Sequence, residues 1–378
     1  MTNERTFNLG SNPCLVFRSC FDDLHIQGWG KPQVQLLLVD ADEEPQLREE
    51  QGTLEISANV PLTAHVPTAS SVLLEGCAGD VRAIGFQQLH ASSHRGDVSV
   101  ARVESVELDT ISGDGLVHEG RSVRASSVNG DLSILSVQDD VSAVSIRGDV
   151  ALTSVRGSVE VRAINGDVSI RNPGGHLRVG DVNGSIELAG NLQSGEYELE
   201  SIGDVTLYVD RASSARLKLE APRGQIASSL EFTRTLESAH VLEGSLGNAV
   251  AEVRALSTAG DIRLRGKRAS EVQQAVEEEV ARAEHWAHRA AERAQHLAEK
   301  LQRRSERRER RVHRRAEHVA RKAQGLAALG RAAAQRAAGR APVNQAAVQE
   351  ERLAVLRMLS QGQINAAQAE KLLAALED

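Results

Sequence analysis

Aromatic and sulfur-containing side chains are scarce in this sequence. Its 378 residues include five Phe, two Tyr, two Trp, three Cys and two Met. Surfaces that bind sugars or unpaired bases are built largely from aromatic rings, so the composition argues against both kinds of surface over most of the chain. Cys14, Cys20 and Cys77 have no metal-type spacing, and we interpret them as reduced thiols; a Cys14 to Cys20 bridge would need an oxidising compartment.

Long apolar runs and export signals are lacking as well. No segment approaches 18 consecutive apolar residues, the length that suggests a transmembrane helix. Residues 1–10 have no basic stretch followed by an apolar core, which a signal peptide would need. We therefore expect a cytoplasmic protein without signal peptide or transmembrane segment, and a peripheral position at the inner membrane face is the alternative.

What the sequence does contain is a recurring turn motif. Glycine followed by aspartate, or by Ser or Gln, returns about every 17 to 21 residues between residues 79 and 260. Glycine provides the positive φ that a tight turn needs, and the apolar residue after the pair begins a strand. The pairs that we interpret as structural turns are Gly79-Asp80, Gly96-Asp97, Gly113-Asp114, Gly130-Asp131, Gly148-Asp149, Gly166-Asp167, Gly203-Asp204 and Gly260-Asp261. The motif has another second residue in Gly184-Ser185, Gly224-Gln225 and Gly244-Ser245.

A fixed period of this length predicts stacked supersecondary units. Weaker turns at the half period, and apolar side chains at every second position, indicate two short strands per unit. We predict a parallel β-solenoid over residues 76–266, roughly 50 Å long for about ten rungs at 4.8 Å spacing. An antiparallel sandwich is the alternative, but it has no reason to repeat its turns in constant register.

Residues 1–75 contain strand-like runs without this period. We predict an antiparallel β lead-in, which would cap the open sheet edge of the first rung. Residues 269–340 are rich in Ala and Arg with apolar spacings of three and four, which predicts a long, coiled-coil-like helix. The net charge of −8 combines about −13 over residues 1–268 with about +5 over residues 269–378.

A basic patch lies within the predicted long helix. Its members are Arg303, Arg304, Arg307, Arg308, Arg310, Arg311, Arg314 and Arg315. Such a patch is a candidate contact for an anionic membrane surface or, less so, for nucleic acid. A solvated helix face, or a contact with the acidic solenoid, explains the same residues. The narrow apolar stripe of the helix favours a homo-oligomer, with a protein partner as the alternative.

Residues 344–378 predict two helices joined by a turn. Gly362 suits the end of the first helix, and Ile364 the entry to the second. The residues of this predicted docking hairpin are Leu353, Leu356, Leu359, Gly362, Ile364, Leu372, Leu373 and Leu376. We expect the leucines to form facing apolar sides. A hairpin this small needs a docking partner, such as another copy of the chain.

Two parts of the sequence resemble known bacterial modules. The segments DLHIQGW at 23–29, QVQL at 33–36 and AHVP at 64–67, with the Gly-Asp pairs that follow, resemble the β-repeat domain labelled "putative adhesin". The C-terminal hairpin resembles the SHOCT-like hairpins attached to such domains. The resemblance implies a non-enzymatic protein, and some members are linked to envelope stress.

An enzyme is the alternative of another class, because parallel β-helices include carboxylate-based polysaccharide lyases and hydrolases. One aspartate per turn is what turn chemistry requires, whereas catalysis needs several groups at one place. The calcium-binding nonapeptide pattern is absent. We therefore predict no catalytic residues, cofactor or metal, and a self-associating scaffold or binding protein. The alternative is a membrane-peripheral regulatory adaptor that uses the Arg-rich helix to bind anionic lipid.

Overall fold

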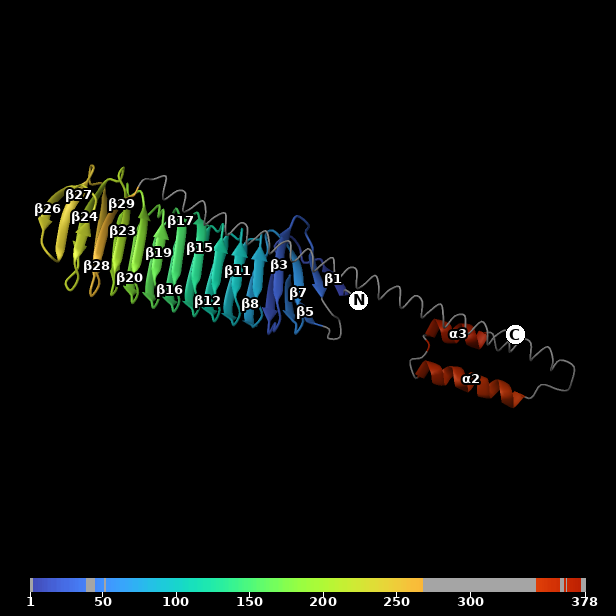
Figure 1. The fold of residues 1–378 in the computed structure, drawn as a ribbon. Helices are drawn as coiled ribbons and strands as arrows, with labels where there is room; N and C mark the ends of the chain where they lie inside the picture. The colour runs from blue at the N-terminus through green and yellow to red at the C-terminus, as the bar shows by residue number, and fades with distance from the viewer. Residues whose placement is uncertain are drawn as a thin grey trace. The chain divides into compact units, whose positions relative to one another are not determined.

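The computed structural model describes residues 3–38, 45–50, 52–267, 345–360, 364 and 366–374. Two compact units divide the chain, Met1–Glu306 and Arg307–Asp378. The first contains a β unit that ends at Lys267, and the second contains a helical hairpin (Figure 1). The predicted helix over 269–340 and its basic patch lie outside the described residues.

The β unit consists of two long sheets. Sheet A contains, in spatial order, β1 (Asn3–Phe7), β4 (Val34–Leu38), β7 (Leu62–Pro67), β3 (Leu24–Trp29), β9 (Val81–Ile84), β11 (Val98–Ala101), β13 (Gly115–His118), β15 (Leu132–Val137), β17 (Val150–Val155), β19 (Val168–Arg171), β21 (Ile186–Gly190), β23 (Val205–Asp210), β29 (Ile262–Lys267) and β25 (Ile226–Ser228). Sheet B contains β26 (Thr233–Glu237), β27 (Val241–Leu246), β24 (Ala215–Glu220), β28 (Ala251–Ser257), β22 (Glu196–Ser201), β20 (Leu177–Val182), β18 (Val159–Ile164), β16 (Val141–Ile146), β14 (Ser122–Val128), β12 (Ser105–Ile111), β10 (Gln88–His94), β8 (Ser71–Cys77), β2 (Cys14–Arg18), β6 (Thr53–Ser57) and β5 (Gln46–Glu50).

Each rung supplies one strand to each sheet, and neighbouring rungs pair in parallel. In sheet A, for example, Leu132 pairs with Val150, Val150 with Val168 and Val168 with Ile186. These side chains are buried between the sheets, as are the equivalent aliphatic residues of sheet B. Burial of every second residue therefore forms one continuous aliphatic core. The predictions of a mainly β chain and of stacked parallel strands are confirmed.

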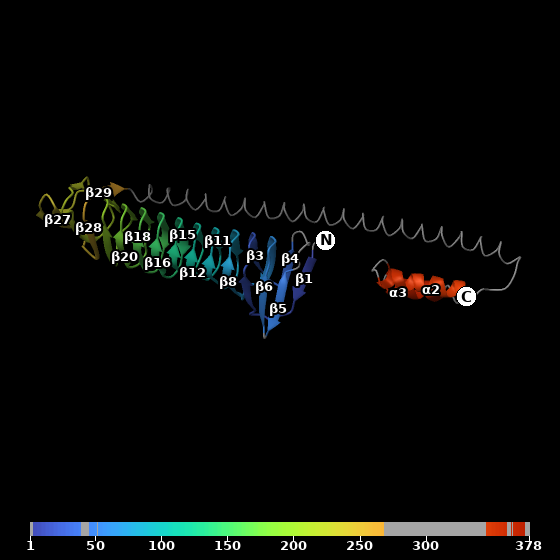
Figure 2. The same ribbon diagram turned by 90° about the horizontal axis from the view of Figure 1, so that it is seen from below.

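The N-terminal 75 residues differ from the predicted antiparallel lead-in. β2 pairs in parallel with both β6 and β8, and β3 pairs in parallel with both β7 and β9. Among the described residues of this segment, only β1, β4 and β5 add antiparallel strands, at the blue end of the β unit (Figures 1 and 2). Leu15 and Phe17, like Leu24 and Ile26, alternate as core residues, so segments 14–29 and 53–67 form rungs although they lack the sequence period.

The order of the rungs at this end is not the order of the sequence. The β2–β3 rung lies between the β6–β7 rung and the β8–β9 rung. The C-terminal end has the same arrangement, because β28–β29 lies between β22–β23 and β24–β25. At both ends the chain passes outward to form the cap and then returns, which leaves antiparallel strands at the ends of the stack.

One predicted turn is wrong. Gly244-Ser245 lies inside β27, where Gly244 pairs with Leu217 of β24 in antiparallel fashion. A Cβ at Gly244 would meet the Phe232 ring and the Thr233 carbonyl oxygen, each at 2.5 Å. This glycine therefore permits close packing of a side chain in the cap.

The helical hairpin consists of α2 (Gln345–Ser360) and α3 (Ala366–Ala374). Val355 and Ala369 are its buried apolar residues, whereas Leu353, Leu356 and Leu372 are exposed. The expectation that the leucines face each other is therefore wrong for these three, because Val355 and Ala369 are buried in their place. Leu359, Ile364 and Leu373 are half-buried, and Gly362 and Leu376 lie outside the described residues. Neither α2 nor α3 is long and apolar enough to cross a membrane.

Candidate functional site

The turn aspartates form a ladder along one edge of the solenoid. The Oδ1 atom of each aspartate accepts the backbone N–H of the corresponding residue in the next rung, at 2.7–3.2 Å. The series runs through Asp23, Asp80, Asp97, Asp114, Asp131, Asp149, Asp167 and Ser185. The first member, Asp23, was missed because no glycine precedes it.

The glycine before each aspartate has a different function from the one predicted. None of the glycines in the Gly-Asp pairs has a positive φ. A Cβ at Gly113 would instead lie 2.3 Å from Asp97 Oδ1 and 2.7 Å from the Gly96 carbonyl oxygen. Glycine is therefore required because the backbone of one rung approaches the carboxylate of the rung before it.

Positive φ values occur at another corner of the rung. Arg102, Glu119, Ser136, Ser154 and Asn172 are left-handed, with φ between 51 and 58°. They follow or lie within the sheet A strands of successive rungs, and Gly85 occupies the same position in the rung before them. Five of the ten non-glycine residues with positive φ in the described chain lie at this corner, because stacking imposes one backbone path on every rung despite its local cost.

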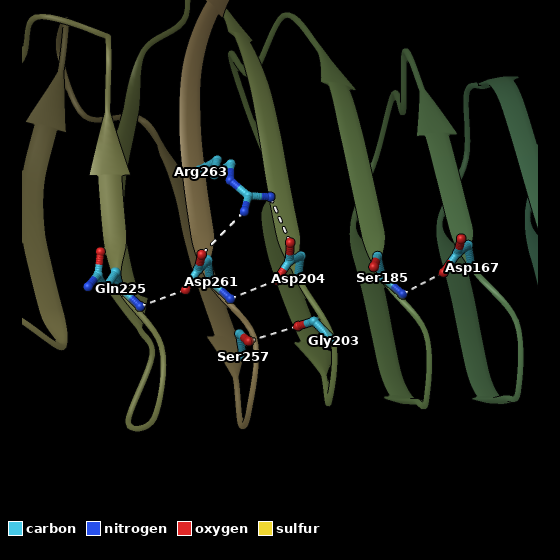
Figure 3. A network of polar contacts seen from close by, with 8 residues as sticks. All are labelled: Asp167, Ser185, Gly203, Asp204, Gln225, Ser257, Asp261 and Arg263. Carbon is cyan, nitrogen blue, oxygen red and sulfur yellow. Dashed lines mark hydrogen bonds and ion pairs between the residues drawn. The ribbon is translucent and has the colours of Figure 1, made fainter.

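The ladder is interrupted at Ser185, which has no carboxylate to offer Asp204 (Figure 3). It resumes beyond the gap, where Asp204 Oδ1 accepts from Asp261 at 2.8 Å and Asp261 Oδ1 accepts from Gln225 at 2.9 Å. Arg263 bridges the second oxygens of both aspartates, at 2.7 and 3.2 Å. The Asp261 N–H, with Arg263, lowers the pKa of Asp204.

This geometry accounts for the predicted turn residues as structural groups. Each carboxylate uses one oxygen to bind the next backbone, and the aspartates follow one another along the stack instead of converging on a point. No cluster of His, Cys, Asp and Glu that could hold a metal is found in the described part of the chain. Convergent acid and base groups, which glycoside chemistry needs, are likewise not formed by this column.

A second candidate site lies on the outward face of sheet B. A shallow cavity of about 380 Å³ extends over β18, β20, β22, β28 and β24. We call it the sheet-B groove and define it by Arg162, Arg178, Gly180, Glu198, Lys218 and Arg254. A second hollow of about 480 Å³ adjoins it over β16 to β22 and shares Arg178 and Glu198 with it. A Cβ at Gly180 would meet nothing within 4 Å, so the missing side chain leaves an open floor.

Charged side chains cross the groove in rung register. Glu160 pairs with Arg178, Arg178 with Glu198, and Glu198 with Arg254, which in turn pairs with Lys218. The row therefore alternates in sign before it ends in two cations. In the sequence, the first charges of this row are about 18 residues apart. The row is recognisable only when the strand register is known, together with the position of the β28–β29 rung between β22–β23 and β24–β25.

The ion pairs of the groove are exposed, and those that Glu198 forms between neighbouring strands are long. Glu198 lies 3.6 Å from Arg178 and 3.8 Å from Arg254, and Arg254 also contacts Glu252 at 2.8 Å. The Glu252 carboxylate raises the pKa of Arg254, and Glu220 raises that of Lys218. Exposed pairs of this kind contribute little to stability, so a partner can replace them at small energetic cost.

These features define a two-sheet parallel β-solenoid with structural turn ladders and a charged outer groove. The family described as Toastrack DUF4097 matches residues 46–265, which is more than half of the chain, and the chain belongs to that family. The predicted resemblance of the β part is thereby confirmed, whereas the SHOCT-like hairpin stays a prediction.

Two crystal structures are similar to this chain. One is a "putative cell adhesion protein" from Clostridium sporogenes ATCC 15579, with 12% identity, coverage of 71% of this chain and 100% of that chain, and a TM-score of 0.19. The other is a "putative adhesin" from Bacteroides fragilis NCTC 9343, with 10% identity, coverage of 70% and 97%, and a TM-score of 0.28. No curated protein matches the sequence.

Proposed function

We propose that this protein is a non-catalytic, self-associating binding scaffold. The hairpin mediates assembly of copies, and the sheet-B groove of each copy contacts a protein partner that carries charges of both signs. The exposed leucines of the hairpin are the observation that carries this proposal. A link to envelope stress stays a prediction from the sequence resemblance.

The hairpin leaves three large apolar side chains exposed. Leu353 is 55% exposed, Leu356 48% and Leu372 42%, while Val355 at the helix contact is 7% exposed. Leu353 and Leu356 are three residues apart and therefore lie on one face of α2. Two identical hairpins can bury these leucines against each other through an isologous contact, because the same patch is then covered on both copies.

Assembly of several copies would allow the sheet-B groove to bind a partner more tightly than a single copy can. A shallow surface of exposed ion pairs supports only weak binding by each copy. Several grooves on one assembly bind a multivalent partner far more tightly, since later contacts form at high effective concentration. The family membership and the names of the similar structures support a binding function over an enzymatic one.

The test is the molar mass of the full-length protein, measured by light scattering after size exclusion. We expect an oligomer at micromolar concentration, and a shift to monomer in the double variant Leu353→Glu, Leu356→Glu. Glu351→Gln, at an exposed position of the same helix, is the control and should leave the mass unchanged. A wild-type monomer would overturn the proposal and make anionic lipid vesicles, the alternative partner of the basic patch, the next ligand to test.

A further inference from the structure

Two cysteines that are 57 residues apart in the sequence occupy equivalent positions in adjacent rungs. Arg18 of β2 pairs with Glu75 of β8, and the ladder continues because the Ala78 N–H donates to the Cys20 carbonyl at 2.7 Å. The same bond links Arg95 to Cys77 at 3.0 Å, where Cys77 pairs with His94. Cys20, Cys77 and His94 are therefore lateral neighbours in three successive rungs.

This position is aliphatic in the rungs that follow. His94 pairs with Ile111, Ile111 with Val128 and Val128 with Ile146, all of them buried. Cys20 and Cys77 are 3% and 1% exposed, so both thiols point into the core. Neighbouring parallel strands are about 4.8 Å apart, which lies within the Cα separation that disulfides tolerate.

The two thiols also influence each other. Their interaction raises the pKa of Cys20 and lowers that of Cys77. Cys77 additionally donates to the Phe17 carbonyl at 3.5 Å. Cys14 stands apart from this pair, because it begins β2 while Cys20 follows its end, and an extended strand separates them by roughly 3.3 Å per residue. A Cys14 to Cys20 bridge is thus excluded in the folded chain.

We propose that Cys20 and Cys77 form a reversible intramolecular disulfide that links the β2–β3 rung to the β8–β9 rung. The bond closes a loop that runs from Cys20 to Cys77 and contains β3 to β7. It would hold the β2–β3 rung between the β6–β7 and β8–β9 rungs, because the chain makes no short connection between β2 and β8. Both groups are free thiols in the structure.

A hydroperoxide can supply the oxidising equivalents. The Cys77 thiolate attacks one oxygen of hydrogen peroxide, the O–O bond breaks, and hydroxide leaves, which gives a sulfenic acid on Cys77. The sulfur of Cys20 then attacks the Cys77 sulfur, the S–O bond breaks, and water leaves. Two thiols and one peroxide yield one disulfide and two waters. Because both thiols are buried, oxidation requires local opening of the rung and should accelerate in mild denaturant.

The experiment treats the reduced full-length protein with hydrogen peroxide and then alkylates the remaining thiols in denaturant. We expect a mass loss of about 2 Da, one alkylated cysteine, and a peptide that joins Cys20 to Cys77; dithiothreitol should restore three alkylated thiols. The matched variant Cys14→Ser should form the same bond. A bridge to Cys14, higher oxides without a bridge, or three unreacted thiols would overturn the proposal.

A second measurement does not depend on any variant of the buried pair. The cross-link lowers the conformational entropy of the unfolded chain. The oxidised wild type should therefore melt about 5–15 °C above the reduced wild type. Dithiothreitol should reverse this shift, and Cys14→Ser should show a shift of the same size. Equal melting temperatures of the two forms would show that the bond does not stabilise the inserted rung.

Discussion

Asp97 Oδ1 accepts the backbone N–H of Asp114, one rung further along the stack, at 2.9 Å. The contact joins two turns that are 17 residues apart and is repeated from rung to rung. It gives each turn aspartate a partner outside its own turn, which local sequence rules for turns do not anticipate.

Replacing a ladder aspartate should therefore weaken the stack unless the acceptor is kept. Asp131→Ala removes the Oδ1 that accepts from Asp149 at 2.9 Å, and we expect a loss of about 1 kcal/mol in the free energy of unfolding. Asp131→Asn retains an Oδ1 and should stay within about 0.5 kcal/mol of wild type. Denaturant unfolding measures both, and an equal loss in the two variants would mean that charge, not the hydrogen bond, is what matters.

The interrupted ladder offers the opposite change. The side chain of Ser185 has no carboxylate or amide oxygen that could accept a backbone N–H from the next rung. Asp204 is the residue whose N–H such an oxygen would accept. Ser185→Asn should extend the series without adding a charge and stabilise the fold by about 0.5–1 kcal/mol. Ser185→Ala is the matched control and should bring no gain; thermal melting that ranks the two variants alike would refute this expectation.

Two glycines allow a direct comparison of close approach with open space. A Cβ at Gly130 would lie 2.1 Å from Asp114 Oδ1 and 2.7 Å from the Gly113 carbonyl oxygen, whereas one at Gly180 would contact nothing within 4 Å. We expect Gly130→Ala to cost about 2 kcal/mol or more, and Gly180→Ala to stay within about 0.5 kcal/mol of wild type. Urea midpoints would test this, and a similar cost at both sites would contradict the proposed function of the paired glycine.

Acid should destabilise the β unit through the buried His94 and the half-buried His25. Burial lowers the pKa of His94, and burial with the nearby Arg82 lowers the pKa of His25 from 6.5 to about 4. The unfolded chain therefore binds more protons, so this contribution to stability is complete above pH 6.5 and is lost as the pH falls toward about 4 for His25. His25→Gln should reduce the loss between pH 6.5 and 4.

The exposed His176 supplies the control for that experiment. His176→Gln removes an imidazole from a solvent-exposed position and therefore controls for the loss of a histidine as such. Denaturant unfolding at several pH values separates the variants. A curve for His25→Gln that coincides with wild type would show that His25 does not remain neutral in the folded chain.

The sequence allowed the rung and its turn residues to be predicted, because both arise from local patterns. Alternation of apolar residues such as Val150 and Leu152 defines the strands, and the Gly-Asp pairs mark one corner of each rung. The left-handed corner was not predictable, since Arg102 and Glu119 are not residue types that favour positive φ. The sheet-B groove was missed because its charges come together only through the parallel register.

The amino-acid sequence by itself determined the parallel stacked fold, the position of the turns and the separate helical hairpin. Short-range periodicity carries this information, because each rung buries the same alternating face whatever its neighbours are. Only the tertiary structure decided which rungs are adjacent at the two ends. The pairings of β2 with β8 and of β22 with β28 join residues 57 and 56 positions apart, and burial of the shared core, not any local signal, selects them.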